Sequence, residues 1–254
     1  ATENAILAAC FAKGKTILEN CAIEPEIKKD LTNFLKKAGV PIKWTGKRTV
    51  KIYGVKKLNS ISYSVMGDRI ECGTFCVAAA MSGGNLKING FDPKLINTEL
   101  SLLKKIGSKI KSYKNEIHIT GPKKIKNIKF LQTKEYDGFP TDLQAQFMTL
   151  LCKAEGRSII HENIFENRFM HVAELRRLGA KIIIKKNKAI IEGKTKFEGA
   201  ELMSSDLRAS VALVLAAIVA QGTSVINRIY HLDRGYENLE KKLNKIGVNI
   251  KRIS

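Results

Sequence analysis

Ser204-Ser205-Asp206-Leu207-Arg208-Ala209-Ser210 precedes an unbroken apolar run over residues 211–220, and a glycine stands at position 222. Ser205 and Asp206 are favoured N-cap residues, and Gly222 suits the left-handed conformation just past a helix end. These signals predict a helix that is apolar on every face. Such a helix must be buried all round, and about ten apolar residues are too few to cross a bilayer. We therefore expect the rest of the fold to wrap this helix.

Arg208 is the unusual residue of this stretch, because a positive charge in a first helical turn opposes the helix dipole. One explanation is that Arg208 pairs with Asp206 or reaches solvent. The other is that Arg208 and the free N–H groups of the turn hold an anion together, since helix N-termini readily bind phosphate and carboxylate groups. The stretch alone leaves both explanations open.

The chain is strongly basic, with 44 Lys and Arg against 24 Asp and Glu among 254 residues, a formal charge of +20. A charge of this size raises the question of a nucleic-acid or membrane-surface partner. The lysines are scattered, and neither a basic face interleaved with aromatics nor an arginine-rich tract is present. We therefore favour general surface charge over a basic groove for a small anion, and expect neither a nucleic acid nor a membrane as partner.

The five cysteines are an odd number in a chain of ordinary core size, so a secreted disulfide framework is not expected. Cys72 and Cys76 lie four residues apart on a predicted apolar helix without a nearby histidine, which favours buried thiols over a metal site. No metal or cofactor is expected. Neither a signal peptide nor a membrane span is visible, which predicts a cytoplasmic protein. The chain opens at a helix start without an initiator Met, and we expect it to be cut from something longer.

One pattern occurs four times along the chain: a capped apolar helix, a small-residue break, a short strand, an amphipathic helix ended by glycine, then paired strands. The helix-ending glycines recur about every 70 residues, at Gly39, Gly107, Gly179 and Gly247. Such a unit cannot cover its own inner helix, so several must close round a shared centre. We expect an α/β fold in which residues 67–254 form a closed three-repeat domain and residues 1–66 belong to another.

Each later repeat places an aspartate at the start of its inner helix, and two of these have an arginine close by: Asp68 with Arg69, Asp142, and Asp206 with Arg208. Taken singly, N-capping explains each aspartate. Three in register favour a concentrated anion site. The loop over residues 230–237 could add Arg234 to the same rim, and Arg168 occupies the equivalent place one repeat earlier.

Four blocks carry a family resemblance: Phe-Pro-Thr-Asp-Leu-Gln-Ala-Gln-Phe at 139–147, Ile-Phe-Glu-Asn-Arg-Phe-Met-His at 164–171, Ser-Asp-Leu-Arg-Ala-Ser at 205–210, and Arg-Ile-Tyr-His-Leu-Asp-Arg-Gly-Tyr-Glu at 228–237. In this order and spacing they closely resemble the bacterial UDP-N-acetylglucosamine 1-carboxyvinyltransferases. The resemblance implies two inside-out α/β barrels, the enolpyruvyl transferase prisms, each of three β-α-β-α-β-β repeats with the active site between them. The chain would hold one complete prism, 67–254, and the last repeat of the other, 1–66.

The resemblance also implies the chemistry. Enolpyruvyl would pass from phosphoenolpyruvate to the 3′-hydroxyl of UDP-N-acetylglucosamine, releasing phosphate, in the first committed step of peptidoglycan synthesis, on which cell-wall growth, cell shape and division depend. The residues it singles out are Asp142 as general base, Arg208 and Arg234 on phosphoenolpyruvate, Asp206 orienting Arg208 or relaying protons, and Ile164 and Arg168 at the substrates. Partial desolvation is expected to raise the pKa of the Asp142 carboxyl into the range of a useful base.

The family has six repeats, whereas four are counted here. The two absent repeats would carry a Lys-Asn pair and the mobile loop with the proton donor, so none of the five cysteines is assigned a catalytic role. We expect the chain to need these N-terminal repeats to complete the active-site cleft, and to be inactive alone. Two alternatives stay open: the sister enzyme 3-phosphoshikimate 1-carboxyvinyltransferase, and a non-catalytic remnant or basic binding module.

Overall fold

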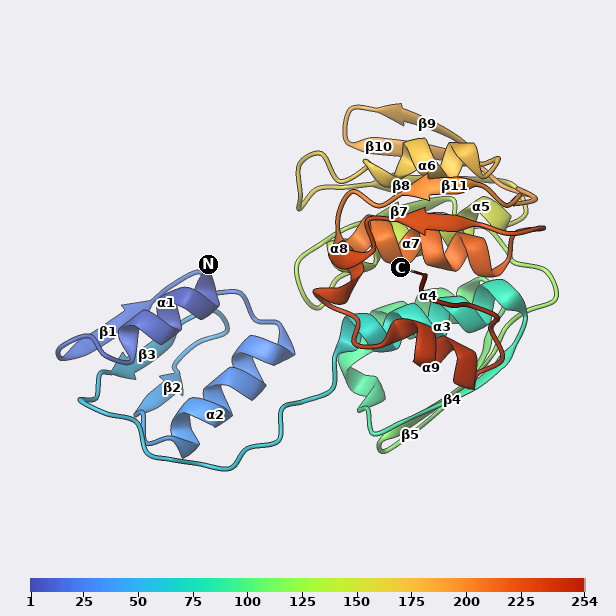
Figure 1. Ribbon diagram of the computed structural model, residues 1–254. Coiled ribbons are helices and arrows are strands. Elements are labelled where there is room, and N and C mark those ends of the chain that lie inside the picture. The colour runs from blue at the N-terminus through green and yellow to red at the C-terminus, as the bar shows by residue number, and fades with distance from the viewer. Residues whose placement is uncertain (254) are drawn as a thin grey trace. The chain divides into compact units, whose positions relative to one another are not determined.

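The computed structural model describes residues 1–253, which divide into two compact units (Figure 1). The first comprises Ala1–Gly67 together with Glu135–Asp137, and the second comprises the rest of the described chain. That these units are a third of one prism and the whole of another remains a prediction.

The first unit is a three-stranded antiparallel sheet covered by helices. Strand β3 (Val50–Tyr53) lies between β1 (Lys15–Leu18) and β2 (Ile42–Trp44). The helices are α1 (Thr2–Ala9), a π-helical segment η1 (Glu26–Leu31) and its continuation α2 (Thr32–Lys37). Fully buried apolar side chains from both layers, such as Ile6, Leu35 and Ile52, form its core. The unit thus has the order of helices and strands predicted for the first repeat.

The second unit is built on three inner helices, α3 (Arg69–Ser82), α5 (Gln144–Lys153) and α7 (Leu207–Ile218), each of which packs against the other two. Helix α7, orange in Figure 1, is buried continuously from Ala209 to Ala216. The predicted buried helix is therefore confirmed, with Asp206 as its N-cap. It ends earlier than expected, because Val219 and Ala220 leave the helical path and Gly222, with φ +85°, lies in the turn that follows.

Sheets enclose the inner helices. One has the strand order β4-β6-β5, the next β7-β8-β10-β9, and the last is a parallel pair, β11-β12. Their bounds are β4 (Asn85–Asn89), β5 (Lys109–Tyr113), β6 (Glu116–Thr120), β7 (Phe130–Gln132), β8 (Arg157–His161), β9 (Lys181–Lys185), β10 (Lys188–Glu192), β11 (Glu201–Met203) and β12 (Val225–Asn227). Strands β4 and β6 pack on α3, and β8 and β10 on α5. Each of these inner helices is thereby covered on its outer side by the sheet of its own repeat.

The amphipathic helices are α4 (Asn97–Lys105), which continues the 3-10 turn η2 (Pro93–Ile96), α6 (His171–Arg177) and α9 (Leu239–Lys245), with the short α8 (Tyr230–Asp233) before α9. The four predicted helix-ending glycines all have positive φ, between +94° and +109°. The paired strands expected after Gly247 are absent among the described residues. There the Asn244 side chain binds both the N–H and the carbonyl of Ile250, which occupies backbone groups that a strand would use for pairing.

All five cysteines are buried and free, as predicted. Within residues 1–253, no helix combines the length and the apolar character that crossing a membrane requires.

Candidate active site

Asp142 lies in a 3-10 turn, η3 (Thr141–Leu143), immediately before the inner helix α5. The N-cap explanation for this aspartate is wrong, because Pro140 holds the cap position of the turn and no side chain caps it. By contrast, Asp68 and Asp206 do cap α3 and α7, each accepting two backbone hydrogen bonds. The Asp142 carboxylate is therefore released from a helix-capping role and available to other side chains.

Two arginines bind the Asp142 carboxylate. Arg168 Nη2 lies 2.6 Å and Arg208 Nε 3.1 Å from the same oxygen, Oδ1. The arginine side chains are largely buried, at 16% and 19% exposure, whereas Asp142 retains 37%. Three predicted site residues from three different segments thus meet at one point. Arg208 pairs with Asp142, so the simpler explanation, a pair with Asp206 or a solvent-exposed side chain, is wrong.

The expectation that desolvation raises the pKa of Asp142 is also wrong. Burial is the largest single effect and pushes this pKa upward, whereas the charge of Arg208 and its hydrogen bond push it down. The charges of Arg168 and Arg69 add to the decrease, so the pKa lies below its ordinary value. In this arrangement Asp142 is a stable carboxylate and a weak base.

Asp206 sets the backbone from which Arg208 projects. Its Oδ1 accepts from the N–H of Arg208 at 2.8 Å and of Ala209 at 3.0 Å. Its charge also reaches His171, a histidine that is 2% exposed. Burial, helped by the charge of Arg168, lowers the pKa of His171 to about 4 although Asp206 opposes the change. His171 belongs to one of the four motif blocks, but that its ring is buried and neutral was not predictable from the motif.

Arg69 and Glu99 form a second buried charged layer near the site. Arg69 is 7% exposed, and its charge lowers the pKa of Asp142 and of Glu99. Glu99, in the first turn of α4, is 3% exposed. Burial raises its pKa to about 7, although a backbone hydrogen bond and the charge of Arg69 act in the opposite direction. Sequence analysis placed Arg69 beside Asp68 at a helix start and missed Glu99, because glutamates are mostly exposed.

Two other predicted residues lie outside this cluster. Ile164 is 44% exposed, and Arg234 is exposed and makes no ion pair or hydrogen bond with any described residue. The loop that carries Arg234 is nevertheless anchored, because the buried hydroxyl of Tyr236 lies 2.8 Å from that of Thr74 on α3. Gln146 donates to the same Thr74 hydroxyl and to the Asp142 carbonyl. Arg234 is thus a cation on an anchored loop, with no side-chain partner among residues 1–253.

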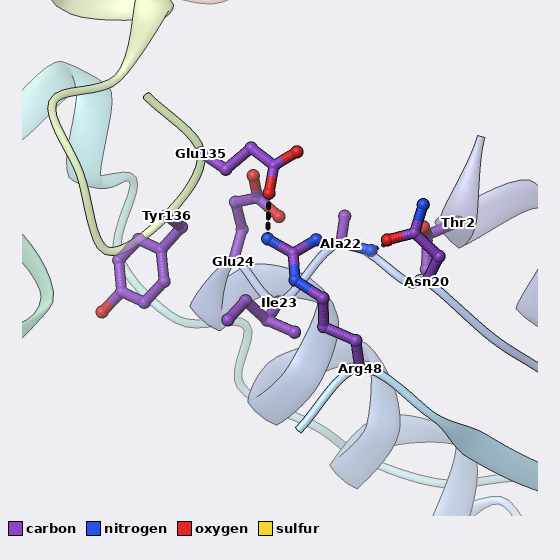
Figure 2. Close-up of a pocket in the computed structure, with 8 residues that line it drawn as sticks. All are labelled: Thr2, Asn20, Ala22, Ile23, Glu24, Arg48, Glu135 and Tyr136. Atoms are coloured by element: carbon purple, nitrogen blue, oxygen red, sulfur yellow. Dashed lines mark hydrogen bonds and ion pairs between the residues drawn. The ribbon is translucent and has the colours of Figure 1, made fainter. Parts of the chain in front are cut away.

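A pocket of about 180 Å³ lies in the first unit, and none of the predicted site residues lines it (Figure 2). Figure 2 shows the Arg48 guanidinium directed at the Glu135 carboxylate, with which it forms an ion pair. Arg48 also donates to the Cys21 carbonyl, and Thr2 accepts from the N–H of Ala22. Thr2, the first residue of α1, thereby holds Ala22 in the wall of the pocket. Across the described chain, no three His, Cys, Asp or Glu side chains gather closely enough to hold a metal ion.

Known proteins resemble the chain over its whole length. The model of the family EPSP synthase (3-phosphoshikimate 1-carboxyvinyltransferase) matches residues 1–243. The UDP-N-acetylglucosamine 1-carboxyvinyltransferase of Pelagibacter ubique (strain HTCC1062) is 68% identical over 254 residues, which are 100% of this chain and 60% of that protein. The protein of the same name from Geotalea uraniireducens (strain Rf4) is 49% identical over 252 residues, 99% of this chain and 60% of its own length. The chain therefore spans about 60% of the length of these curated relatives.

Solved structures agree on the fold. The enolpyruvyl transferase NikO from Streptomyces tendae superposes with a TM-score of 0.87 at 26% identity, over 97% of this chain and 59% of that one. EPSP synthase from Acinetobacter baumannii gives 0.73 at 22% identity, over 98% and 60%. The predicted prism fold and the resemblance read from the four motifs are confirmed. The chain belongs to the EPSP synthase (3-phosphoshikimate 1-carboxyvinyltransferase) family of enolpyruvyl transferases, and its curated relatives are UDP-N-acetylglucosamine 1-carboxyvinyltransferases.

Proposed function

We propose that this chain is the larger part of an enzyme that transfers enolpyruvyl from phosphoenolpyruvate to the 3′-hydroxyl of UDP-N-acetylglucosamine, releasing phosphate, in peptidoglycan synthesis in the cytoplasm. The observation that carries the proposal is the Asp142 carboxylate held at 2.6 Å and 3.1 Å by two largely buried guanidiniums. The names of the 68% and 49% identical relatives support the same substrates.

Phosphoenolpyruvate presents a carboxylate and a phosphate, and guanidinium groups match both in charge and in geometry. Arg208 and Arg168 already stand at the carboxylate of Asp142. Arg234 offers a further cation without a protein partner among the described residues. We assign phosphoenolpyruvate to Arg208 and Arg234, with Arg168 beside them, and backbone contact with the nucleotide sugar to Ile164.

Binding of this anion changes the state of Asp142. When substrate oxygens take over the guanidinium of Arg208, the interactions that lower the pKa of Asp142 weaken, and burial then raises it. Asp142 can then accept the proton of the sugar hydroxyl while the hydroxyl oxygen bonds to C2 of phosphoenolpyruvate. C3 gains a proton from a donor outside this chain, giving a tetrahedral intermediate. Return of a C3 proton to that donor and cleavage of the C2–O bond to phosphate then yield the enolpyruvyl ether and free phosphate.

The test uses a full-length chimera in which this chain replaces the matching residues of the Pelagibacter ubique relative, because the chain covers 60% of that protein. We expect the chimera to release phosphate from phosphoenolpyruvate only when UDP-N-acetylglucosamine is present, and this chain alone to release none. The family model also names a shikimate 3-phosphate enzyme, so shikimate 3-phosphate is the second acceptor to test. Turnover with shikimate 3-phosphate alone would replace the proposed substrate, and no turnover with either acceptor would favour a non-catalytic binding module.

A further inference from the structure

Glu162 is the most heavily hydrogen-bonded buried carboxylate near the site. It directly follows strand β8 and is 3% exposed. It accepts four hydrogen bonds: from Thr133 Oγ1 at 2.8 Å, Thr141 Oγ1 at 3.0 Å, the N–H of Ile164 at 2.9 Å and the N–H of Phe165 at 3.1 Å. A buried carboxylate is costly unless hydrogen bonds of this kind compensate its lost hydration. The four donors come from three separate segments, which the carboxylate ties together.

These contacts reach both partners of the central ion pair. On one side, Thr141 directly precedes Asp142 in the turn η3. On the other side, the Arg168 guanidinium stacks over the ring of Phe165, 4.7 Å from its centre, and donates to Asp142. A closed circuit of contacts therefore runs from Glu162 through Thr141 and Asp142 to Arg168, and back through Phe165.

We infer that Glu162 is a positioning residue, which fixes the Asp142 turn and the Ile164–Phe165 loop relative to each other through the Thr141 hydroxyl and two backbone amides. The inference rests on the proposed function, since Asp142 is there the base and Ile164 a contact of the nucleotide sugar. Misplacing reacting groups by about 1 Å can cost about 100-fold in rate. A single anchor for both segments is therefore expected to affect turnover and sugar binding together.

The distribution of the four donors makes Gln a conservative replacement and Ala a disruptive one. Oε1 takes three of the hydrogen bonds, and Oε2 takes only that from the Thr141 hydroxyl. In Glu162→Gln the amide oxygen can keep the Oε1 position. Its NH2 can donate to the Thr141 hydroxyl, because a hydroxyl can also accept. Glu162→Ala leaves both backbone N–H groups and both hydroxyls without this acceptor.

The experiment compares Glu162→Ala and Glu162→Gln in the chimera, with Glu198→Ala, which removes an exposed carboxylate, as the control. For Glu162→Ala we expect a higher KM for UDP-N-acetylglucosamine and a lower kcat, with kcat/KM reduced about 10- to 100-fold. Glu162→Gln should stay within about threefold of the parent, because its hydrogen bonds can be kept. Parental kinetics for Glu162→Ala would overturn the inference.

Two further measurements keep the test decisive. If Glu162→Ala does not fold, Thr141→Val removes one hydroxyl only, and should lower kcat while leaving the KM for the sugar nucleotide close to the parental value; an unchanged kcat would count against the inference. Amide hydrogen exchange at Ile164 and Phe165 needs no substrate and should accelerate in Glu162→Ala. An inactive parent chimera would refute the proposed function alone, whereas unchanged exchange at these two amides would refute the role of Glu162.

Discussion

Arg168 donates to Oδ1 of Asp142 across 2.6 Å, the shorter of the two arginine contacts to that oxygen. The two residues lie 26 positions apart, one before an inner helix and one before an outer helix. Because the Nη2 group of Arg168 and the Nε group of Arg208 share one carboxylate oxygen, an anion that takes over these N–H groups displaces Asp142 from them. Under the proposed function, we therefore expect binding of the anionic substrate to change the basicity of Asp142.

Replacing Asp142 by Asn separates these two functions. The amide cannot accept the hydroxyl proton, so kcat should fall by about 10²- to 10⁴-fold, the usual contribution of general base catalysis. Phosphoenolpyruvate should bind as tightly as before or more tightly, because its anionic groups no longer compete with a carboxylate for Arg208. Steady-state kinetics and calorimetry on the chimera measure the two effects. Normal turnover would remove the base assignment, and weaker binding would contradict the competition.

Arg208→Lys tests whether the fork geometry of the guanidinium is needed. The contact with Asp142 runs through Nε, which lysine lacks, and an ammonium cannot bind a carboxylate in the two-pronged manner of arginine. We expect the KM for phosphoenolpyruvate to rise about tenfold or more, which corresponds to about 1.4 kcal/mol of lost binding. Arg177→Lys, on the exposed side of α6, is the control and should not change it. An unchanged KM in Arg208→Lys would show that charge alone suffices.

The repeats and the inner helices were predictable from the sequence because both depend on local signals. Caps, a run of apolar residues and left-handed glycines at 39, 107, 179 and 247 act within a few positions of the chain. The fourth repeat departed at its end, where Asn244 binds the backbone of Ile250 in place of a neighbouring strand. Whether that segment pairs depends on partners that the repeat pattern does not specify.

The members of the ion-pair cluster around Asp142 were predictable from the motifs, but which side chains contact one another was not. Asp142, Arg168 and Arg208 were selected by motif, yet their sharing of one oxygen requires α5, α6 and α7 to be placed in three dimensions. The sign of the pKa change at Asp142 followed from that pairing and was therefore wrong when argued from burial alone. Glu162 and Glu99 were missed because acidic residues are usually exposed, and their burial depends on the three-dimensional fold.

Glu99 should make stability depend on pH near neutrality. Its pKa is raised to about 7 in the folded chain, against about 4.5 when exposed. The contribution of Glu99 to the free energy of unfolding is therefore fully present below about pH 4.5. It is lost as pH rises through 7, and the loss for a pKa change of this size is about 3 kcal/mol. Glu99→Gln carries no such charge, so its thermal midpoint relative to the parent should improve between pH 5 and pH 8. Glu198→Gln is the matched control, and a pH-independent difference for Glu99→Gln would contradict the prediction.

His171 should act in the opposite sense, on the acidic side. Its pKa is about 4 in the folded chain and about 6.5 when unfolded, so the unfolded state binds the proton more readily between these values. The free energy of unfolding therefore carries no penalty from His171 above pH 6.5. As pH drops from 6.5 towards 4, it falls by about 3 kcal/mol because of this residue.

His171→Gln removes this titration while keeping a polar side chain of similar length. At pH 7 the variant should be less stable than the parent, because the imidazole is 2% exposed and its packing is lost. That deficit should shrink as the pH is lowered to 4, since only the parent is then weakened by protonation. Thermal unfolding of the chimera at half-unit pH steps measures the difference, with His231→Gln on α8 as the control. A deficit that stays constant from pH 7 to pH 4 would contradict the lowered pKa of the buried ring.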